Sequence, residues 1–528
     1  MIICNVYGDV VRLPYANNAS YNTRQAPNYQ EPQGCMEGTR IQIIAELKKW
    51  AFDDEAPRVC WLNGLAGTGK TCIAHTLSET LDEEQMLGAS FFCSHSASQQ
   101  VRDASFIIPT VATKLSQASP LLRSAVSQAM EGEPDVVSLY TLFTQFRLLL
   151  EKPIQRVIDP AIKTYKIIVI DALDECTNLD TVEKLIEAIV TFARNIPLKF
   201  FISSRDTTAI RGVFNQNPTH PPKIFSLHDD VEDAVVQEDI KLYLETSLSA
   251  IARRNPHPIH WPPRDELDIL LERSDRLFIY AATAIRYIGV RDIDFRKRLT
   301  DVTRLTPATM QTDIDSLYNI IMEQAFHSEL EPREVTPRRE TLSTAVFLLV
   351  PLCMDGIASL LSMDSFQTRV ALSPFRSVIH VPASDTSPVS IFHTSFRDFI
   401  VHPSRCEKFS LNSSEGHRML TVHCLRCLNR DLKRDIYKNM TPSPSYDPGA
   451  IPDGLRYSCL NWASHLVYAL AGTLPFHSVI EDVYEFLNHH LLHWFECLSA
   501  LSDLESGIKS LDKAHEAISV STRFTSRY

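Results

Sequence analysis

A glycine-rich segment that ends in a lysine and a threonine is the part of this sequence most suited to chemistry. Residues 64–71, Gly-Leu-Ala-Gly-Thr-Gly-Lys-Thr, fit the phosphate-loop pattern G-x-x-x-x-G-K-[ST]. In such a loop several backbone N–H groups and the start of the next helix converge on one centre, which suits two phosphates. Lys70 would reach the outer phosphates, and the Thr71 hydroxyl would ligate the Mg²⁺ that bridges them. The pattern therefore predicts a nucleotide site.

The context of the motif favours this interpretation over a glycine-rich turn without a ligand. A strand-like run, residues 58–62, precedes it, and a helix with an apolar face at Ile73, Ala74, Leu77 and Leu81 follows it. The residues predicted to hold the nucleotide here are Gly64, Leu65, Ala66, Gly67, Thr68, Gly69, Lys70, Thr71 and Cys72.

A second motif follows about a hundred residues later. The apolar run 167–170 is typical of a buried parallel strand, and it ends in Asp171. Asp171 is predicted to hold Mg²⁺ through water opposite Thr71. Asp174 and Glu175 lie just beyond, where one carboxylate could orient or deprotonate the attacking water. The alternative is a buried strand closed by a polar turn.

A third strand-like run, residues 199–203, is followed by Ser204 and Arg205. An arginine at that strand end is well placed to sense the terminal phosphate of a nucleotide. Taken alone, Arg205 would more often be a solvated loop residue.

Strand-like and helical stretches alternate through this part of the chain. The predicted strands are residues 58–62, 87–93, 167–171, 199–203 and 223–227. Such alternation predicts an α/β fold with a mostly parallel sheet and helices on both of its faces. A ligand of such a sheet lies at the carboxyl ends of the strands, which is where Gly64, Asp171 and Arg205 fall.

Together these elements resemble the NACHT family of P-loop NTPases, part of the larger STAND class of nucleotide-controlled switches. The motifs that carry the resemblance are residues 64–71, the segment Asp171-Ala172-Leu173-Asp174-Glu175 and the strand end Ser203-Ser204-Arg205. Further segments typical of the fungal branch are residues 34–40, 61–71, 277–283 and 393–399. The resemblance spans about residues 20–500 and implies roles in innate immunity, cell death or self/non-self recognition.

The resemblance and the periodicity together give a predicted domain order. Residues 1–33 are polar and poor in pattern, which predicts a disordered tail or the remnant of a preceding domain. The domains expected after it are a P-loop NTPase core at 34–230, an all-α helical domain at 231–334, a winged-helix domain at 335–405 and a C-terminal helical domain at 406–528. We expect a proline-rich loop at 256–263 and a Pro/Ser-rich linker at 441–454.

The resemblance to the NACHT family bears on the roles of two positions outside the core. In similar proteins a winged-helix histidine contacts the ADP β-phosphate and locks a closed state, and His393 in Phe-His-Thr-Ser-Phe fits that pattern. From its surroundings alone, His393 would more often be a satisfied core histidine. Many STAND proteins place Gly-x-Pro in the helical domain to touch the base or ribose, but this chain has residues 275–279, Asp-Arg-Leu-Phe-Ile. The base contact is therefore unassigned.

Composition restricts the partners and the compartment. The net charge of −12 argues against a nucleic-acid surface and favours protein partners. Twelve cysteines without regular spacing suit a reducing compartment. Cys424 and Cys427 form the C-x-x-C pair, which could bind a metal but fits two buried helical cysteines better. No segment is predicted to span a membrane or to act as a signal peptide, so we expect a cytoplasmic protein.

Three functions are compatible with these observations. The first is a switch that ADP closes and ATP opens into a homo-oligomer, reset by slow NTP hydrolysis with Mg²⁺; GTP in place of ATP is also possible. The second is a nucleotide-binding scaffold without turnover, and the third is a motor-type ATPase. We find no N-terminal effector domain and no repeats after the helical domain, so the chain is expected to be either a truncated gene product or a stand-alone module.

Overall fold

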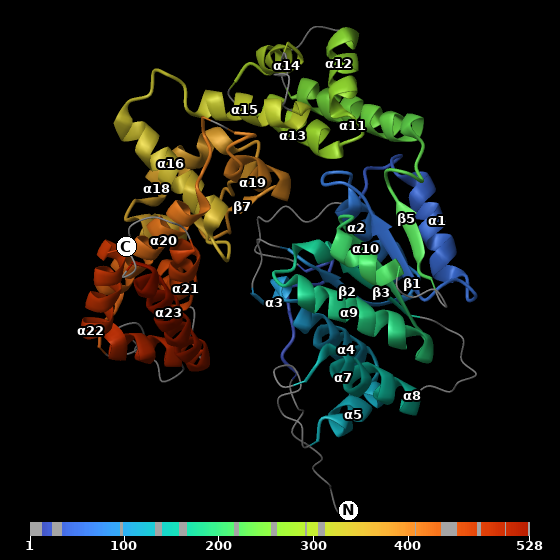
Figure 1. Ribbon diagram of the computed structural model, residues 1–528. Helices are drawn as coiled ribbons and strands as arrows, with labels where there is room; N and C mark the ends of the chain where they lie inside the picture. Colours follow the sequence, from blue (N-terminus) through green and yellow to red (C-terminus); the bar gives the residue numbers. More distant parts are fainter. Residues whose placement is uncertain are drawn as a thin grey trace, which may run out of the picture. The chain divides into compact units, whose positions relative to one another are not determined.

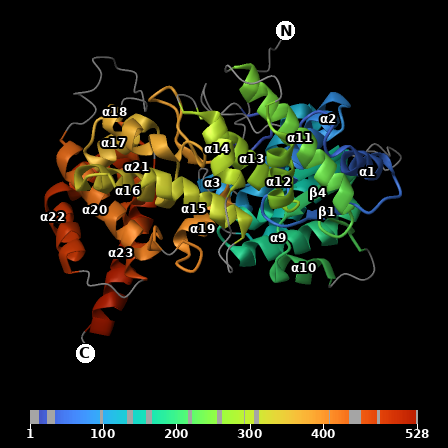
Figure 2. The same ribbon diagram turned by 90° about the horizontal axis from the view of Figure 1, so that it is seen from above.

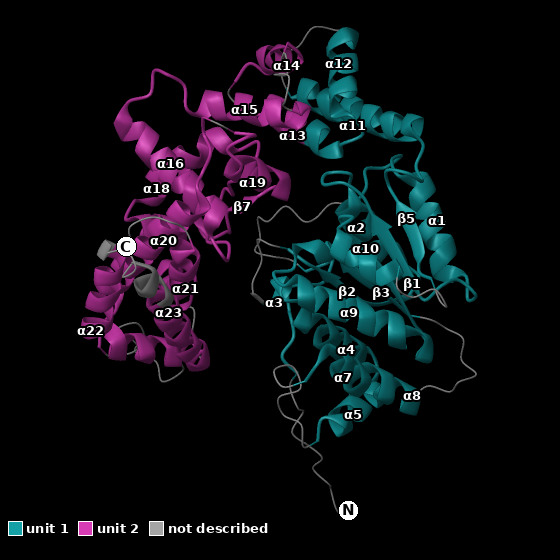
Figure 3. Cartoon of the chain, in the orientation of Figure 1, with its two compact units in different colours: residues 1–25, 30–282 teal, residues 26–29, 283–528 magenta. Residues whose placement is uncertain are grey.

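The computed structural model divides the chain into two compact units (Figure 1, Figure 3). Unit 1 comprises residues 1–25 and 30–282, and unit 2 comprises residues 26–29 and 283–528. The residues that the structure describes are 13–23, 34–94, 99–131, 140–157, 166–215, 221–254, 261–290, 293–304, 312–406, 408–434, 451–471, 477–501 and 503–525. Most of the predicted loop 256–263 and of the predicted linker 441–454 lies outside these ranges.

Unit 1 is built on a five-stranded sheet with the order β2-β3-β4-β1-β5, and all of its pairs are parallel. The strands are β1 (Val59–Asn63), β2 (Leu87–Phe92), β3 (Lys166–Asp171), β4 (Leu198–Ser204) and β5 (Lys223–Ser226). Each lies within one residue of a predicted strand, so the predicted α/β P-loop fold is confirmed.

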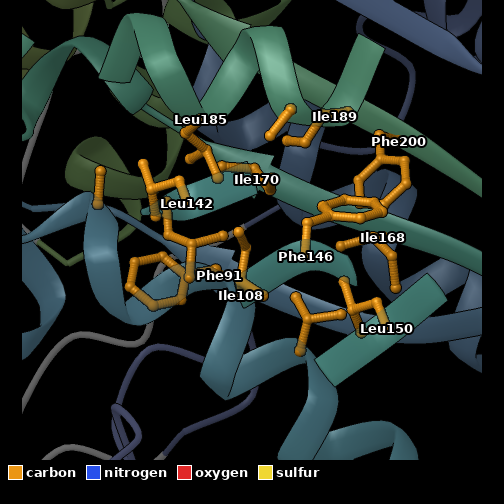
Figure 4. Close-up of a cluster of buried hydrophobic side chains, with 14 of the residues drawn as sticks. Phe91, Ile108, Leu142, Phe146, Leu150, Ile168, Ile170, Leu185, Ile189 and Phe200 are labelled. Carbon is orange, nitrogen blue, oxygen red and sulfur yellow. The ribbon is translucent and has the colours of Figure 1, made fainter. Parts of the chain in front are cut away.

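Helices cover both faces of this sheet, because successive residues of the apolar strands point to opposite sides. In β3, Ile168 and Ile170 belong to one hydrophobic core, whereas Ile167 and Val169 belong to the other. The first core is closed by α4 (Ile107–Ala118), α7 (Leu142–Phe146) and α9 (Leu179–Phe192), and Figure 4 shows part of it. The second core is closed by α1 (Ile41–Phe52) and α2 (Lys70–Glu83).

The other helices of unit 1 surround the sheet or follow it. Those before β5 are α3 (Gln99–Arg102), α5 (Pro120–Ala129), α8 (Lys152–Val157) and α10 (Thr208–Asn215). Those after it are α11 (Asp233–Arg253), α12 (Arg264–Ser274) and the start of α13 (Phe278–Ile288).

Part of the predicted N-terminal tail differs from the expectation. Residues 13–23 pack on the edge strand β2, where the Phe92 N–H donates to the Ala19 carbonyl at 2.8 Å and the Tyr21 N–H donates to the Ser90 hydroxyl at 3.0 Å. Ala16 and Ala19 are buried in the core. The segment is ordered because it satisfies polar groups that a bare sheet edge would leave exposed. Residues 1–12 and 24–33 lie outside the described part of the chain.

The described residues of unit 2 form helices, one short antiparallel pair, β6 (Ile379–His380) and β7 (Ser390–Ile391), and an isolated bridge between Cys353 and Pro388. Its helices before that pair are α14 (Phe295–Thr303), α15 (Asp313–Ala325), α16 (Pro332–Phe347), α17 (Met354–Leu361) and α18 (Ser365–Leu372), several of which Figure 2 labels. Those after it are α19 (Thr394–Val401), α20 (Ser413–Asp431), α21 (Asp453–Leu470), α22 (His477–Ala500) and α23 (Leu504–Thr525). The division into helical, winged-helix and C-terminal helical domains stays a prediction.

Two further expectations bear on these helices. Cys424 and Cys427 are both fully buried on α20, and burial raises the pKa of the Cys427 thiol to about 11. Within the described ranges, no three His, Cys, Asp or Glu side chains gather as metal ligands. None of the helices in those ranges is long and apolar enough to cross a membrane.

A buried chain of hydrogen bonds joins α20 to α21. The Nδ1 atoms of His417 and His465 lie 2.8 Å apart, and the Tyr457 hydroxyl lies 2.6 Å from His465 Nε2. The Leu349 N–H donates to the same hydroxyl at 3.0 Å. A hydrogen bond between the two Nδ1 atoms requires that one of them carries no proton, so at least one of the two rings is neutral. Burial lowers the pKa of His417 to about 4 and that of His465 below its usual range.

This pair should make unit 2 sensitive to acid. Because the folded pKa of His417 lies below the unfolded value of about 6.5, the stabilisation is complete above that pH and is lost as the pH falls toward 4. At pH 5 we expect a loss of about 2 kcal/mol from His417 alone. Thermal unfolding between pH 7.5 and 5 tests this, with exposed His515→Gln as the control. A His417→Gln variant with an unchanged pH dependence would contradict it.

Candidate functional site

The phosphate loop, residues 64–69, connects β1 to α2 and has the backbone that its glycines allow. Gly67 and Gly69 have φ values of 81° and 92°, in the left-handed region that favours glycine. Gly69 is the N-cap residue of α2, and no side chain caps the helix there. The N–H groups of the first turn therefore remain available to an anion, which the helix dipole also attracts.

Lys70 lies at the start of α2 with its ammonium turned along the loop. It donates to the carbonyls of Gly64 and Leu65, each at 2.9 Å. Burial lowers its pKa, while the charges of Asp174 and Asp171 act in the opposite direction. The long stem allows the ammonium to turn to phosphate oxygens instead. Leu65 is exposed, and Cys72 is exposed on the first turn of α2.

Asp171 ends β3 and is only 1% exposed. Burial raises the pKa of its carboxyl to about 6, although hydrogen bonds from Ser203 and Thr71 and the charge of Lys70 lower it. The Ser203 hydroxyl donates to the carboxylate and also accepts the Ala172 N–H at 3.0 Å. Ala172 has a φ of 53°, which turns the chain sharply after the strand. The contact with Thr71 brings the two predicted metal ligands together.

The two acids after Asp171 have different surroundings. Asp174 forms an ion pair with Arg205, with 3.1 Å between Arg205 Nε and Asp174 Oδ2, and it also accepts the Arg205 N–H at 2.8 Å. This carboxylate therefore orients Arg205. Glu175 ends the short turn Leu173–Glu175 and is half-buried.

The sheet explains why residues far apart in sequence meet. β1 and β3 both pair with β4, and the register joins Asn63 to Ser204 and Ile170 to Ile202. The carboxyl ends of these three strands are therefore adjacent, and the phosphate loop, Asp171 and Arg205 follow them directly.

The residues present fit a nucleotide with Mg²⁺. A side chain added at Gly69 would meet nothing within 4 Å, so this part of the loop lies open. The Thr71 hydroxyl and the Asp171 carboxylate are oxygen ligands of the kind that Mg²⁺ prefers. Lys70 and the uncapped start of α2 supply the positive charge that phosphates need.

The segment 275–279, for which the sequence left no assignment, contacts the phosphate loop. The Ile279 N–H donates to the Gly67 carbonyl at 3.1 Å. Arg276 donates to the carbonyl of His228 at 2.8 Å and pairs with Asp233 at 2.6 Å. Sequence reasoning missed these contacts, because nothing in the apolar pattern of α13 indicates which loop its first turn touches.

His393 belongs to unit 2, where it is the N-cap residue of α19. Its Nδ1 accepts the Ser395 N–H at 3.1 Å, and the Ser395 hydroxyl lies 2.8 Å from that of the buried Tyr318. In the neutral ring the proton is therefore on Nε2. The β-phosphate contact of His393 stays a prediction.

The two loop glycines give a matched test of this geometry. Gly69→Ala should cost only the backbone strain of a positive φ, roughly 1–2 kcal/mol. Gly67→Ala should cost more, because the new Cβ would lie 2.1 Å from Ile279 Cγ2. We expect the free energy of unfolding of the nucleotide-free protein, measured by denaturant titration, to fall further in Gly67→Ala than in Gly69→Ala. Equal losses would mean that the contact with Ile279 does not constrain the loop.

One family model matches part of unit 1. Residues 38–205 match the family model described as Nephrocystin 3, N-terminal. A search of the curated proteins finds no match.

Three solved structures are similar to the chain at low identity. A STAND protein with a tetratricopeptide repeat sensor from Pyrococcus horikoshii is 13% identical, with a TM-score of 0.40, and covers 94% of this chain; the chain spans 66% of that protein. C. elegans PCH-2 is 12% identical (TM-score 0.27; 53% of this chain, 69% of that one). A Drosophila ORC chain, solved bound to DNA, is 11% identical (TM-score 0.25; 91% and 71%). At TM-scores this low, none of the three carries an argument about function.

The family match covers the segment that holds the phosphate loop, Asp171 and Arg205. In residues 38–205 this chain carries a P-loop NTPase region of the NACHT/STAND type.

Proposed function

We propose that this protein is a nucleotide-controlled signalling switch of the NACHT/STAND class that binds ADP or ATP with Mg²⁺. The observation that supports a switch rather than a simple enzyme is the bond from the Ile279 N–H to the Gly67 carbonyl. It ties the main chain of the phosphate loop to the first turn of α13. A change in the conformation of the loop on nucleotide exchange would therefore alter the position of the helices that follow the core.

Each residue of the site has a distinct role in this proposal. Lys70 and the N–H groups at the start of α2 bind the phosphates. Mg²⁺, held by Thr71 and Asp171, would neutralise charge on the phosphates. Glu175 orients the attacking water, and Arg205, held by Asp174, senses the terminal phosphate. Hydrolysis then resets the switch and is slow.

The finer parts of the proposal rest on the family resemblance. ADP keeps the protein closed with His393 on the β-phosphate, and ATP opens a surface for a homo-oligomer or for protein partners. The setting is cytoplasmic, in NLR-like innate immunity or self/non-self recognition. GTP is the alternative nucleotide.

The nucleotide that co-purifies with the chain is the first test. We expect near-stoichiometric ADP and a turnover with Mg-ATP below about one per minute, against about 10 per second for a typical enzyme. Acid release with chromatography and a steady-state phosphate assay measure the two quantities. Lys70→Ala should carry no nucleotide, because it removes the charge that faces the phosphates.

The other outcomes separate the remaining hypotheses. Fast turnover would indicate a motor-type ATPase, and bound nucleotide without any turnover would indicate the nucleotide-binding scaffold. The absence of any binding would mean that the phosphate loop holds no nucleotide. His393→Ala should retain less ADP than the parent; equal retention in a folded variant would exclude the β-phosphate contact.

The two acids should respond differently to amide substitution. Glu175→Gln is expected to lower the rate of hydrolysis by about a hundredfold or more while leaving ATP affinity nearly unchanged, because it removes the water-orienting carboxylate. Asp174→Asn is expected to lower the affinity for ATP more than the affinity for ADP, because it loosens Arg205, which is proposed to contact the terminal phosphate. Single-turnover hydrolysis and competition binding measure these effects. The assignment is wrong if Asp174→Asn abolishes hydrolysis and Glu175→Gln does not.

A further inference from the structure

Arg40 is a buried cation against the outer side of the phosphate loop. It is the N-cap residue of α1, has a φ of 57° and is only 4% exposed. Its Nη2 donates to the Thr68 carbonyl at 2.7 Å. The sequence motif around it carries the family resemblance, but nothing in its pattern assigns this contact.

A phosphate loop needs such a donor for a simple geometric reason. When its N–H groups turn toward the ligand, the carbonyls of the same peptides turn away from it. Thr68 is buried, so its outward carbonyl requires a partner within the protein. Without one, a flipped peptide that presents its oxygen to the phosphates becomes competitive. A charged donor fixes the outward orientation most strongly.

The groups that hold Arg40 come from the helices after the core. Asp239 on α11 accepts the Arg40 N–H at 3.0 Å and lies 4.0 Å from its Nε. The guanidinium lies over the Phe278 ring, at the start of α13, with 4.7 Å to the ring centre. The next residue, Ile279, donates to the Gly67 carbonyl. Two consecutive loop carbonyls are therefore held through α11 and α13.

We propose that Arg40 is a positioning residue of the phosphate loop, and that it couples retention of the bound nucleotide to the docking of α11 and α13. This inference rests on the proposed nucleotide site and adds to it a route by which the helices control release. Loosening of either helix removes a support of Arg40, which frees the Thr68 peptide and speeds dissociation.

Lysine cannot replace arginine here. The planar guanidinium reaches the Thr68 carbonyl with one nitrogen, faces Asp239 with another and lies over the Phe278 ring. An ammonium would supply the charge at one point only. Burial lowers the pKa of Arg40, and the charge of Asp239 acts in the opposite direction.

The dissociation rate of a fluorescent ADP analogue, chased with unlabelled ADP from the full chain, tests the proposal. We expect Arg40→Met to speed dissociation about tenfold or more, the loss of one charged hydrogen bond. Arg40→Lys should recover only part of the difference. Lys49→Met, which removes an exposed charge from the same helix, is the matched control and should be unchanged.

Asp239→Asn keeps an acceptor for the Arg40 N–H but removes the charge, so it tests the coupling even if Arg40→Met fails to fold. We expect dissociation about threefold faster, and a combined effect with Arg40→Met that is less than additive. Folded Arg40→Met and Asp239→Asn variants that release ADP at the parent rate would overturn the inference. If neither the parent protein nor Lys70→Ala binds nucleotide, the proposed function itself is wrong.

Discussion

The orientation of the peptide groups in the phosphate loop is the constraint on which the site depends. A loop that turns its N–H groups toward one centre is possible only with positive φ values at Gly67 and Gly69. The same turn leaves carbonyls on the outer side, and two groups satisfy them: the Ile279 N–H at Gly67 and Arg40 at Thr68. The loop is therefore shaped as much by its outer contacts as by its glycines.

In the proposed function, the carboxylates at the end of β3 and in the turn after it have different roles because their surroundings differ. Asp171 is buried and accepts hydrogen bonds from two hydroxyls, which suits a metal ligand. The Asp174 carboxylate binds both the side chain and the backbone N–H of Arg205. If Asp174 acted as a base, this pair would be disrupted. In the proposed function, Asp174 therefore orients Arg205, and the role of orienting the attacking water is assigned to Glu175.

The sheet and the chemical motifs were readable from sequence, whereas the contacts between distant segments were not. Runs such as 167–170 are apolar on both faces and short, which leaves few alternatives to a buried parallel strand. The phosphate loop has the same residue spacing in any chain, because its glycines, lysine and threonine must contact the same phosphates and Mg²⁺. By contrast, the ordered segment 13–23, the Asp174–Arg205 pair and the bond from Arg40 to Thr68 depend on which surfaces the fold brings together. No local sequence pattern indicates which distant segments come into contact.

A ligand shifts a conformational equilibrium only by the difference in its affinity for the two states. ADP and ATP differ at the terminal phosphate, so discrimination between them must arise at groups that reach it, such as Lys70 and Arg205. Arg40 and Ile279 contact loop carbonyls, so they do not directly distinguish a diphosphate from a triphosphate. Their part is to convert a change in the loop into a change in α11 and α13. Sensing and transmission are thus separate tasks carried by different residues on opposite sides of the same six-residue loop, so a substitution can in principle alter one without the other.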